Sequence, residues 1–96
     1  MPAYVIADPR QVSDVEKLME YGRLTSPTLK AHGARYLVAG ADIEILEGEW
    51  NSERLVIVEF PDMAAVKRWY NSEEYKPLIA LRQAASKGNL IAIDGV

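Results

Sequence analysis

The sequence predicts an α+β fold in which one antiparallel sheet carries helices on a single face. Four segments have the short apolar runs typical of strands, helical spacing fills the first and last of the three intervals between them, and turn residues separate the elements. The resulting order, β-α-β-β-α-β, is that of the ferredoxin-like split βαβ arrangement with a four-stranded sheet. A chain of 96 residues has the usual size of one domain, so we expect residues 1–96 to form a single domain.

The chain begins with a predicted buried strand. Residues 3–7 (AYVIA) are apolar and rich in strand-forming residues, and the turn signal Asp8-Pro9 is expected to end the strand. A helix should follow at Ser13, because Ser13 and Glu16 have the spacing of a capping box.

A proline divides this first helical segment in the prediction. Proline suits the first turn of a helix and not its interior, so Ser26-Pro27 is expected to interrupt the helix. Ser26 would then cap a second, short helical piece that ends near His32-Gly33.

Two strands are expected in the middle of the chain. Residues 34–40 (ARYLVAG) indicate the second strand, and β character resumes at residues 43–46 (IEIL). Residues 54–60 (RLVIVEF) are the strongest strand, with the continuous apolar run of a strand covered on both faces.

The last third of the chain should form two helical pieces and a strand. Asp62 is the expected cap of a helix whose buried stripe includes Met63, Val66 and Tyr70, with Trp69 displaced from it. Further helical residues run from about 75 to 86, and the final strand is predicted at residues 90–93 (LIAI), after Lys87-Gly88-Asn89.

Composition and charge exclude several classes of function. The net charge is −3 and no basic run is present, unlike a nucleic-acid-binding protein. The absence of cysteine excludes disulfides, thiolate catalysis and cysteine-based zinc sites. No apolar run reaches the length of a membrane-spanning helix and no signal peptide is evident, so we expect a cytoplasmic protein without membrane or nucleic-acid partners.

The strands predict that two copies of the chain associate. Helices on one face of a four-stranded sheet leave the other face uncovered, and neither alternating set of strand residues is cleanly polar. A monomer would therefore expose a large apolar patch. We expect a homodimer with C₂ symmetry in which the two sheet faces pack together.

Candidate catalytic residues are His32 and Glu59. His32 is the only histidine and would carry a proton near neutral pH, although a histidine at a helix C-terminus is also favoured electrostatically. Glu59 and Arg35 would supply polar groups to a mostly apolar small-molecule site if both faced one cavity. The alternative is that they lie in solvent at strand ends or pair with each other.

The connection before the third strand contains a second group of candidates. Glu47, Trp50 and Arg54 could close over a polar ligand, with Arg54 binding an anionic group in bidentate fashion. Trp50 could equally anchor a dimer contact. The segment RWYNSEEY contributes Trp69 and Tyr75, either as pocket lining or as packing at a corner between helices. No metal-ligand spacing surrounds His32, so we expect neither a metal nor a cofactor.

The chain resembles the domain-of-unknown-function 1330 family. The resemblance covers nearly the whole chain and rests on AYVIA, HGARYLVAG, LEGEW, RLVIVEFPDMAAVKRWYNSEEY and LRQAA followed by a closing strand. Its most specific part is EFPDMAAVKRWYNSEEY, residues 59–75. It implies membership of the dimeric α+β-barrel superfamily, in which ferredoxin-like domains pair through their sheets. The residues that match the recurrent pattern are Arg35, Glu47, Gly48, Trp50, Arg54, Glu59, Trp69, Ser72 and Tyr75.

The family resemblance implies no single activity. Members of the superfamily include cofactor-free monooxygenases, haem-degrading enzymes, lactone isomerases and stress-responsive proteins, with sites in the cavity between sheet and helices. We expect this chain to bind or transform a small aromatic or carboxylic acid in that cavity, as a cofactor-independent isomerase or monooxygenase if it is an enzyme. The alternative is a non-catalytic stress-associated or structural homodimer.

Overall fold

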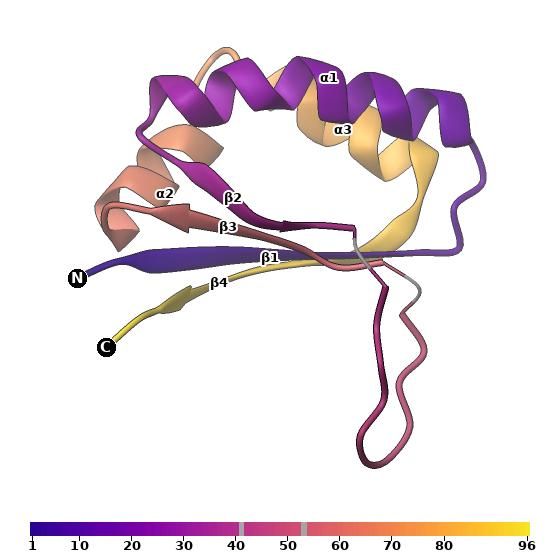
Figure 1. Cartoon of the computed structure of the whole chain (residues 1–96). Coiled ribbons are helices and arrows are strands. Elements are labelled where there is room, and N and C mark those ends of the chain that lie inside the picture. Colours follow the sequence, from indigo (N-terminus) through magenta and orange to yellow (C-terminus); the bar gives the residue numbers. More distant parts are fainter. Residues whose placement is uncertain (41, 53) are drawn as a thin grey trace.

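The protein has one four-stranded antiparallel sheet with three helices on one face (Figure 1). A computed structural model describes residues 1–40, 42–52 and 54–96. The strands lie in the order β2-β3-β1-β4, so the predicted ferredoxin-like fold is confirmed. The elements are β1 (Ala3–Arg10), α1 (Val15–Ala31), β2 (Arg35–Ala39), β3 (Val56–Phe60), α2 (Met63–Tyr70), α3 (Lys76–Ala85) and β4 (Lys87–Asp94).

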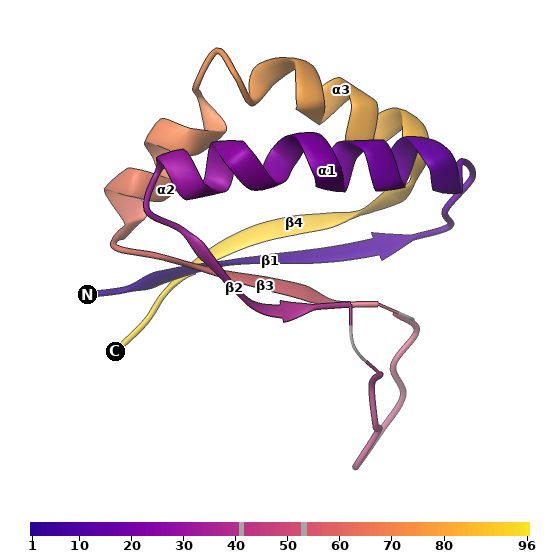
Figure 2. The same ribbon diagram turned by 45° about the horizontal axis from the view of Figure 1, so that its top comes forward.

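The alternation of strand residues separates a buried face from an open face. Ala3 and Val5 of β1 are buried and pair in register with Phe60 and Val58 of β3, which are also buried. The helices cover this face in both views (Figure 2). The intervening residues form the open face, where Ile91 and Ile93 of β4 are 53% and 52% exposed.

The first helix differs from the prediction at its start and in its middle. Asp14 is the cap, because its carboxylate accepts the Lys17 backbone N–H, whereas the Ser13 hydroxyl donates to the Ala85 carbonyl. The predicted interruption at Ser26-Pro27 is wrong, since α1 is continuous through Pro27.

The buried face of α1 explains its continuity. Thr25, Thr28 and Leu29 are buried on both sides of Pro27, so packing compensates for the backbone hydrogen bond that proline cannot make. The Ser26 hydroxyl donates to the Gly22 carbonyl within the same helix instead of capping a new one.

β1 and its neighbour β4 are both longer than predicted. β1 continues through Asp8-Pro9 to Arg10, and β4 starts at Lys87 rather than Leu90, because these ends pair with each other. Pro9 is tolerated because, among the described residues, β1 pairs with β4 alone beyond Ala7. A Cβ atom at Gly88 would clash with the Asp8 carbonyl oxygen, so the close approach of the strands requires glycine.

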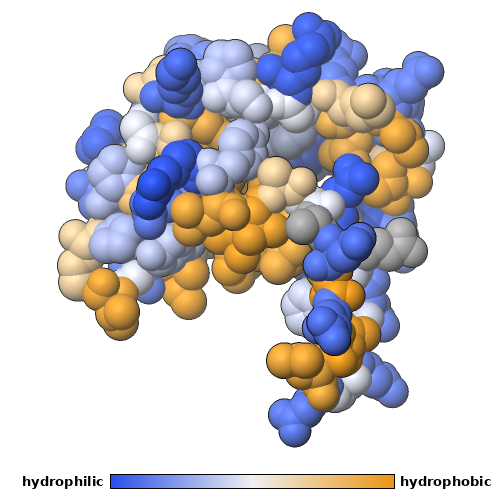
Figure 3. Space-filling view, in the orientation of Figure 1, coloured by the Kyte–Doolittle hydropathy of each residue, from blue (hydrophilic) through white to orange (hydrophobic). Residues whose placement is uncertain are grey.

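The predicted β character at residues 43–46 is wrong. The described residues between β2 and β3 form a loop that projects away from the sheet on the open-face side (Figures 1 and 2). Apolar surface runs along this loop and below the sheet (Figure 3). The exposed apolar residues of the loop are Ile43, Ile45, Leu46 and Trp50.

The aromatic residues of α2 are placed the other way round from the prediction. Trp69 is 2% exposed and Tyr70 is 39% exposed. The buried stripe is Ala65, Val66 and Trp69, which have i, i+1 and i+4 spacing. Asp62 caps α2 as predicted, since its carboxylate accepts the Ala65 backbone N–H.

Candidate functional site

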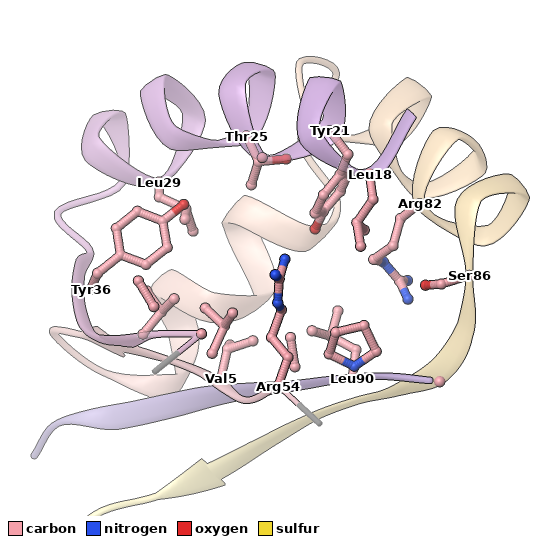
Figure 4. A pocket seen from close by; sticks show the side chains of 18 of the residues that line it. Val5, Leu18, Tyr21, Thr25, Leu29, Tyr36, Arg54, Arg82, Ser86 and Leu90 are labelled. Atoms are coloured by element: carbon pink, nitrogen blue, oxygen red, sulfur yellow. The ribbon is translucent and has the colours of Figure 1, made fainter. Parts of the chain in front are cut away.

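A cavity of about 410 Å³ lies between the helices and the covered face of the sheet (Figure 4). Its floor contains Val5, Val56 and Val58 from the central strands, and α1 forms the opposite side. The volume falls within the range of small-molecule sites, which are mostly apolar with a few placed polar groups.

One face of α1 supplies most of the helical wall. Leu18, Tyr21, Thr25 and Leu29 recur at helical spacing and all line the cavity. Tyr21 and Thr25 place polar atoms on this wall (Figure 4). The Thr25 Oγ1 atom is buried and has no hydrogen-bond partner among the described residues.

Two arginines provide the charge of the cavity. Arg54, just before β3, rises from the sheet side toward α1, and Arg82 reaches in from α3 beside Ser86 (Figure 4). The Arg82 Nε atom is buried without a hydrogen-bond partner in the described part of the chain. No Asp, Glu or His occurs among the described residues that line the cavity.

Gly40 leaves the space that Arg54 occupies. It has φ = +77°, and its backbone N–H donates to the Leu55 carbonyl at 2.9 Å. A Cβ atom at this position would lie 3.2 Å from Arg54 Cγ and 3.4 Å from Arg54 Cδ and Nε. The left-handed turn at the end of β2 therefore lets the arginine stem pass into the cavity.

A stack of aromatic rings closes the inner end of the cavity. The Trp69 ring lines the cavity, and its centroid lies 4.0 Å from that of Tyr75 and 5.4 Å from that of Phe60. The Tyr75 hydroxyl lies 2.7 Å from the hydroxyl of Tyr21. Burial, with a contribution from Tyr21, raises the pKa of Tyr75 well above its usual value, so Tyr75 remains a neutral phenol.

The candidate catalytic residues His32 and Glu59 lie outside this cavity and are not brought together. His32 is the C-terminal cap of α1, where its Nδ1–H donates to the Thr28 carbonyl at 2.9 Å. Glu59 lies on the open face and accepts a 2.9 Å hydrogen bond from Arg35 Nε, the pairing that the sequence left open as an alternative. A catalytic role for either residue stays a prediction.

The candidate ligand-binding residues divide between the cavity and the surface. Arg54 and Trp69 line the cavity, and Tyr75 lies behind Tyr21 in its wall. Arg35 lies on the open face, and Glu47 and Trp50 lie on the exposed loop. The structure thus groups three of these six residues around one space.

Sequence reasoning missed Tyr21, Thr25 and Arg82 as cavity residues. The helical spacing of Leu18, Tyr21 and Thr25 was a signal for Tyr21 and Thr25. Val15 and Met19 also have helical spacing with Leu18 or its neighbours and are exposed, so spacing alone does not identify the buried stripe. Arg82 carried no local signal, because its burial depends on how α3 docks against α1.

Two further features of the described residues concern metals and membranes. Residues 1–40, 42–52 and 54–96 contain no group of three or more His, Cys, Asp or Glu arranged to hold a metal ion. None of the helices described there has the length and apolarity needed to cross a bilayer.

Solved structures similar to this chain share its fold. A protein of unknown function from Rhodopseudomonas palustris is 21% identical, with a TM-score of 0.78 over 99% of this chain and 82% of that one. A dimeric ferredoxin-like protein of unknown function from Jannaschia sp. CCS1 is 10% identical, with a TM-score of 0.75 over 99% and 100%. An ethyl tert-butyl ether d (ethd) family protein from Bacillus halodurans is 14% identical, with a TM-score of 0.66 over the full length of both chains.

These identities are low, so the structural likeness establishes the fold alone. No curated protein matches the sequence. One family model, described as a domain of unknown function (DUF1330), matches residues 2–96. The match covers nearly the whole chain and agrees with the predicted resemblance, so this protein belongs to the DUF1330 family.

Proposed function

We propose that this protein binds a small organic acid in the cavity between the helices and the sheet. The observation that carries the proposal is the pair of guanidinium groups, Arg54 and Arg82, in a cavity whose described lining contains no carboxylate. Guanidinium groups bind carboxylates through charge-assisted hydrogen bonds, which are stronger where water is excluded.

The remaining lining favours an acid with an apolar body. Aliphatic side chains from α1 and from all four strands, together with the Trp69 ring, surround the space beyond the arginines. An aromatic or branched aliphatic group would bury apolar surface there, while the carboxylate satisfies the buried Arg82 Nε. This matches the chemical class expected from the sequence.

Binding without turnover is favoured over catalysis by the composition of the lining. Proton abstraction needs a base within hydrogen-bond reach of the substrate, and no carboxylate or imidazole lies among the described lining residues. Turnover by an isomerase or monooxygenase mechanism is the second candidate, and the Tyr21 hydroxyl, which lines the cavity, would be its proton-bearing group.

We further propose that the protein is a homodimer that pairs through its open sheet faces. The support is the apolar character of that face, the projecting loop with exposed Trp50, and a structural relative described as dimeric. A second copy would cover both surfaces, because a C₂ interface places the same patch on each partner.

The test of acid binding uses Arg82. Thermal-shift measurements with a library of aromatic and short-chain acids should identify ligands, because a ligand at a hundred times its dissociation constant adds about 2.7 kcal/mol of stability. Arg82→Met keeps most of the side-chain length and removes the charge. We expect it to weaken the affinity of the best acid by about tenfold or more, since a hydrogen bond to a charged group contributes about 1.5–3 kcal/mol.

The matched control is Arg68→Met on α2, an exposed arginine that does not line the cavity. It should leave affinity within about twofold. The proposal is wrong if no acid in the library stabilises the protein, or if Arg82→Met and Arg68→Met bind the same acid equally well.

A further inference from the structure

The hydroxyl pair of Tyr21 and Tyr75 lies at the wall of the cavity and has a defined direction. Tyr21 lines the cavity from α1, whereas Tyr75, at the start of α3, is fully buried behind it. Their oxygens are 2.7 Å apart, so one hydroxyl donates to the other.

The burial of Tyr75 decides which hydroxyl donates. Among the described residues, the Tyr21 oxygen is the only hydrogen-bond acceptor at the Tyr75 hydroxyl. Either hydroxyl could donate on distance alone, but a buried O–H without an acceptor carries an uncompensated desolvation cost, which favours donation from Tyr75 to Tyr21. Tyr21 then keeps its own proton for a partner in the cavity.

Arg82, like the Tyr21 hydroxyl, requires a hydrogen-bond acceptor in the cavity. Arg82 lines the same cavity and has only N–H donors, and its buried Nε has no acceptor among the described residues. Arg82 also lies two turns after Tyr75 on one face of α3, and helical side chains point back toward the N-terminus. The donors of Arg82 and Tyr21 therefore meet at the same end of the cavity.

We propose that this end of the cavity selects 2-oxo acids, with the carboxylate at Arg82 and the adjacent keto oxygen at Tyr21. The inference rests on the proposed binding of organic acids and specifies which of them the site prefers. A 2-oxo acid places two kinds of oxygen acceptor on neighbouring carbons, opposite two neighbouring donors. The buried and unpartnered Thr25 Oγ1, one turn from Tyr21 on α1, adds a further polar atom to this end.

Related acids fit this end of the cavity less well. An acid with an unsubstituted second carbon leaves the Tyr21 proton unpaired inside an apolar cavity, and the corresponding amino acid directs ammonium donors at the Tyr21 and Arg82 donors. A site built to hydrogen-bond a ligand atom rejects the analogue that lacks that atom.

The test compares two acids that differ by one oxygen atom. Titration calorimetry should show that the wild-type protein binds 2-oxo-4-phenylbutanoate about tenfold more tightly than 4-phenylbutanoate, the difference expected for one buried hydrogen bond. Tyr21→Phe should abolish this preference, so that it binds the two acids about equally. Its affinity for 4-phenylbutanoate should stay within about threefold of wild type.

Two further variants control for altered folding. Tyr21→Phe/Tyr75→Phe removes both hydroxyls, leaves no buried hydroxyl without a partner, and should lose the same preference. Tyr70→Phe removes a hydroxyl from a partly exposed ring that does not line the cavity and should keep it. Circular dichroism would verify that each variant is folded before titration.

The outcomes separate this inference from the proposed function. If wild type binds both acids equally, or if the preference survives in Tyr21→Phe, the inference is wrong while acid binding stands. If neither these two acids nor any other acid binds, the proposed function is wrong and this inference falls with it.

Discussion

At the scale of single residues, a short hydrogen-bonded chain joins the core to the wall of the cavity. The Trp69 Nε1–H donates to Thr28 Oγ1 at 3.0 Å, and the Thr28 hydroxyl donates to the Thr25 carbonyl at 2.7 Å. Trp69 and Thr28 are both buried, so neither the indole N–H nor the hydroxyl has water as an alternative partner. This chain fixes the Trp69 ring against α1 and hence shapes the cavity wall.

Replacement of Thr28 by valine tests the importance of this chain. Thr28→Val keeps the side-chain shape and leaves the buried indole N–H without an acceptor, which should lower the free energy of unfolding by about 1–3 kcal/mol in urea denaturation. Thr28→Ser keeps the hydroxyl and loses one methyl group, so it should cost less than Thr28→Val. Equal losses in the two variants would mean that the hydrogen bond contributes little beyond packing.

At the scale of the elements, Asp8 connects three parts of the chain at the end of β1. Its Oδ2 atom accepts hydrogen bonds from Arg10 Nε at 2.8 Å and from Asn89 Nδ2 of β4 at 3.5 Å. The Ser52 hydroxyl, from the connection between β2 and β3, donates to the Arg54 carbonyl at 2.8 Å and also acts on the Asp8 carboxylate. The polar groups of Ser52, Arg10 and Asn89 outweigh burial and lower the pKa of Asp8 below its usual value.

The lowered pKa of Asp8 predicts a loss of stability in acid. In the unfolded chain Asp8 takes up a proton near pH 3.9, above its folded pKa, so the unfolded state binds more protons as the pH falls. The contribution of Asp8 is therefore present above about pH 4 and is lost as the pH falls through the lower, folded pKa.

Urea denaturation between pH 2 and pH 6 measures this contribution. The stability of Asp8→Asn should fall less steeply with acid than that of wild type, because asparagine does not titrate. Ser52→Ala, which removes the largest cause of the lowered pKa, should have an intermediate slope. Parallel curves for wild type and Asp8→Asn would show that Asp8 makes no such contribution.

At the scale of the whole molecule, the two faces of the sheet have different environments. The helices cover one face and border the cavity, whereas the other face presents apolar side chains beside a projecting loop that has both charged and exposed apolar residues (Figures 1 and 3). A contiguous apolar surface of this kind, unlike apolar residues scattered singly, is typical of a protein–protein interface.

Substitutions that introduce charge on the open face should prevent the two copies from associating. Wild type should sediment at about twice the chain mass of 10.7 kDa, and Ile91→Glu/Ile93→Glu should sediment as a monomer because burying unpaired carboxylates is costly. Met19→Glu places a charge at an exposed apolar position on α1 and should leave the dimer intact. A wild-type monomer, or a dimer that survives both glutamates, would contradict the proposed interface.

Local patterns of the sequence were sufficient to predict the type and order of the elements. The alternation in strands and the caps of helices depend on residues close together in the chain, so the ferredoxin-like fold, the Asp62 cap and the uncovered face of the sheet were all predictable. The errors at Ser13 and at Ser26-Pro27 occur where tertiary contacts outweigh local preference, as with the Ser13 hydroxyl that donates to Ala85. The error at residues 43–46 has the opposite cause, because this exposed segment projects away from the sheet and does not pair with a strand in the described part of the chain.

The sequence by itself determined the fold class and several residues that surround the cavity, namely Arg54, Trp69 and Tyr75. Only the tertiary structure decided that Tyr21 and Tyr75, which are 54 positions apart, share a hydrogen bond, and that Arg82 lines the same cavity with its Nε atom buried. It also placed His32 and Glu59 away from the cavity. The physical reason is that a local pattern specifies which face of an element is apolar, whereas the docking of α1 and α3 on the sheet decides which polar side chains meet inside.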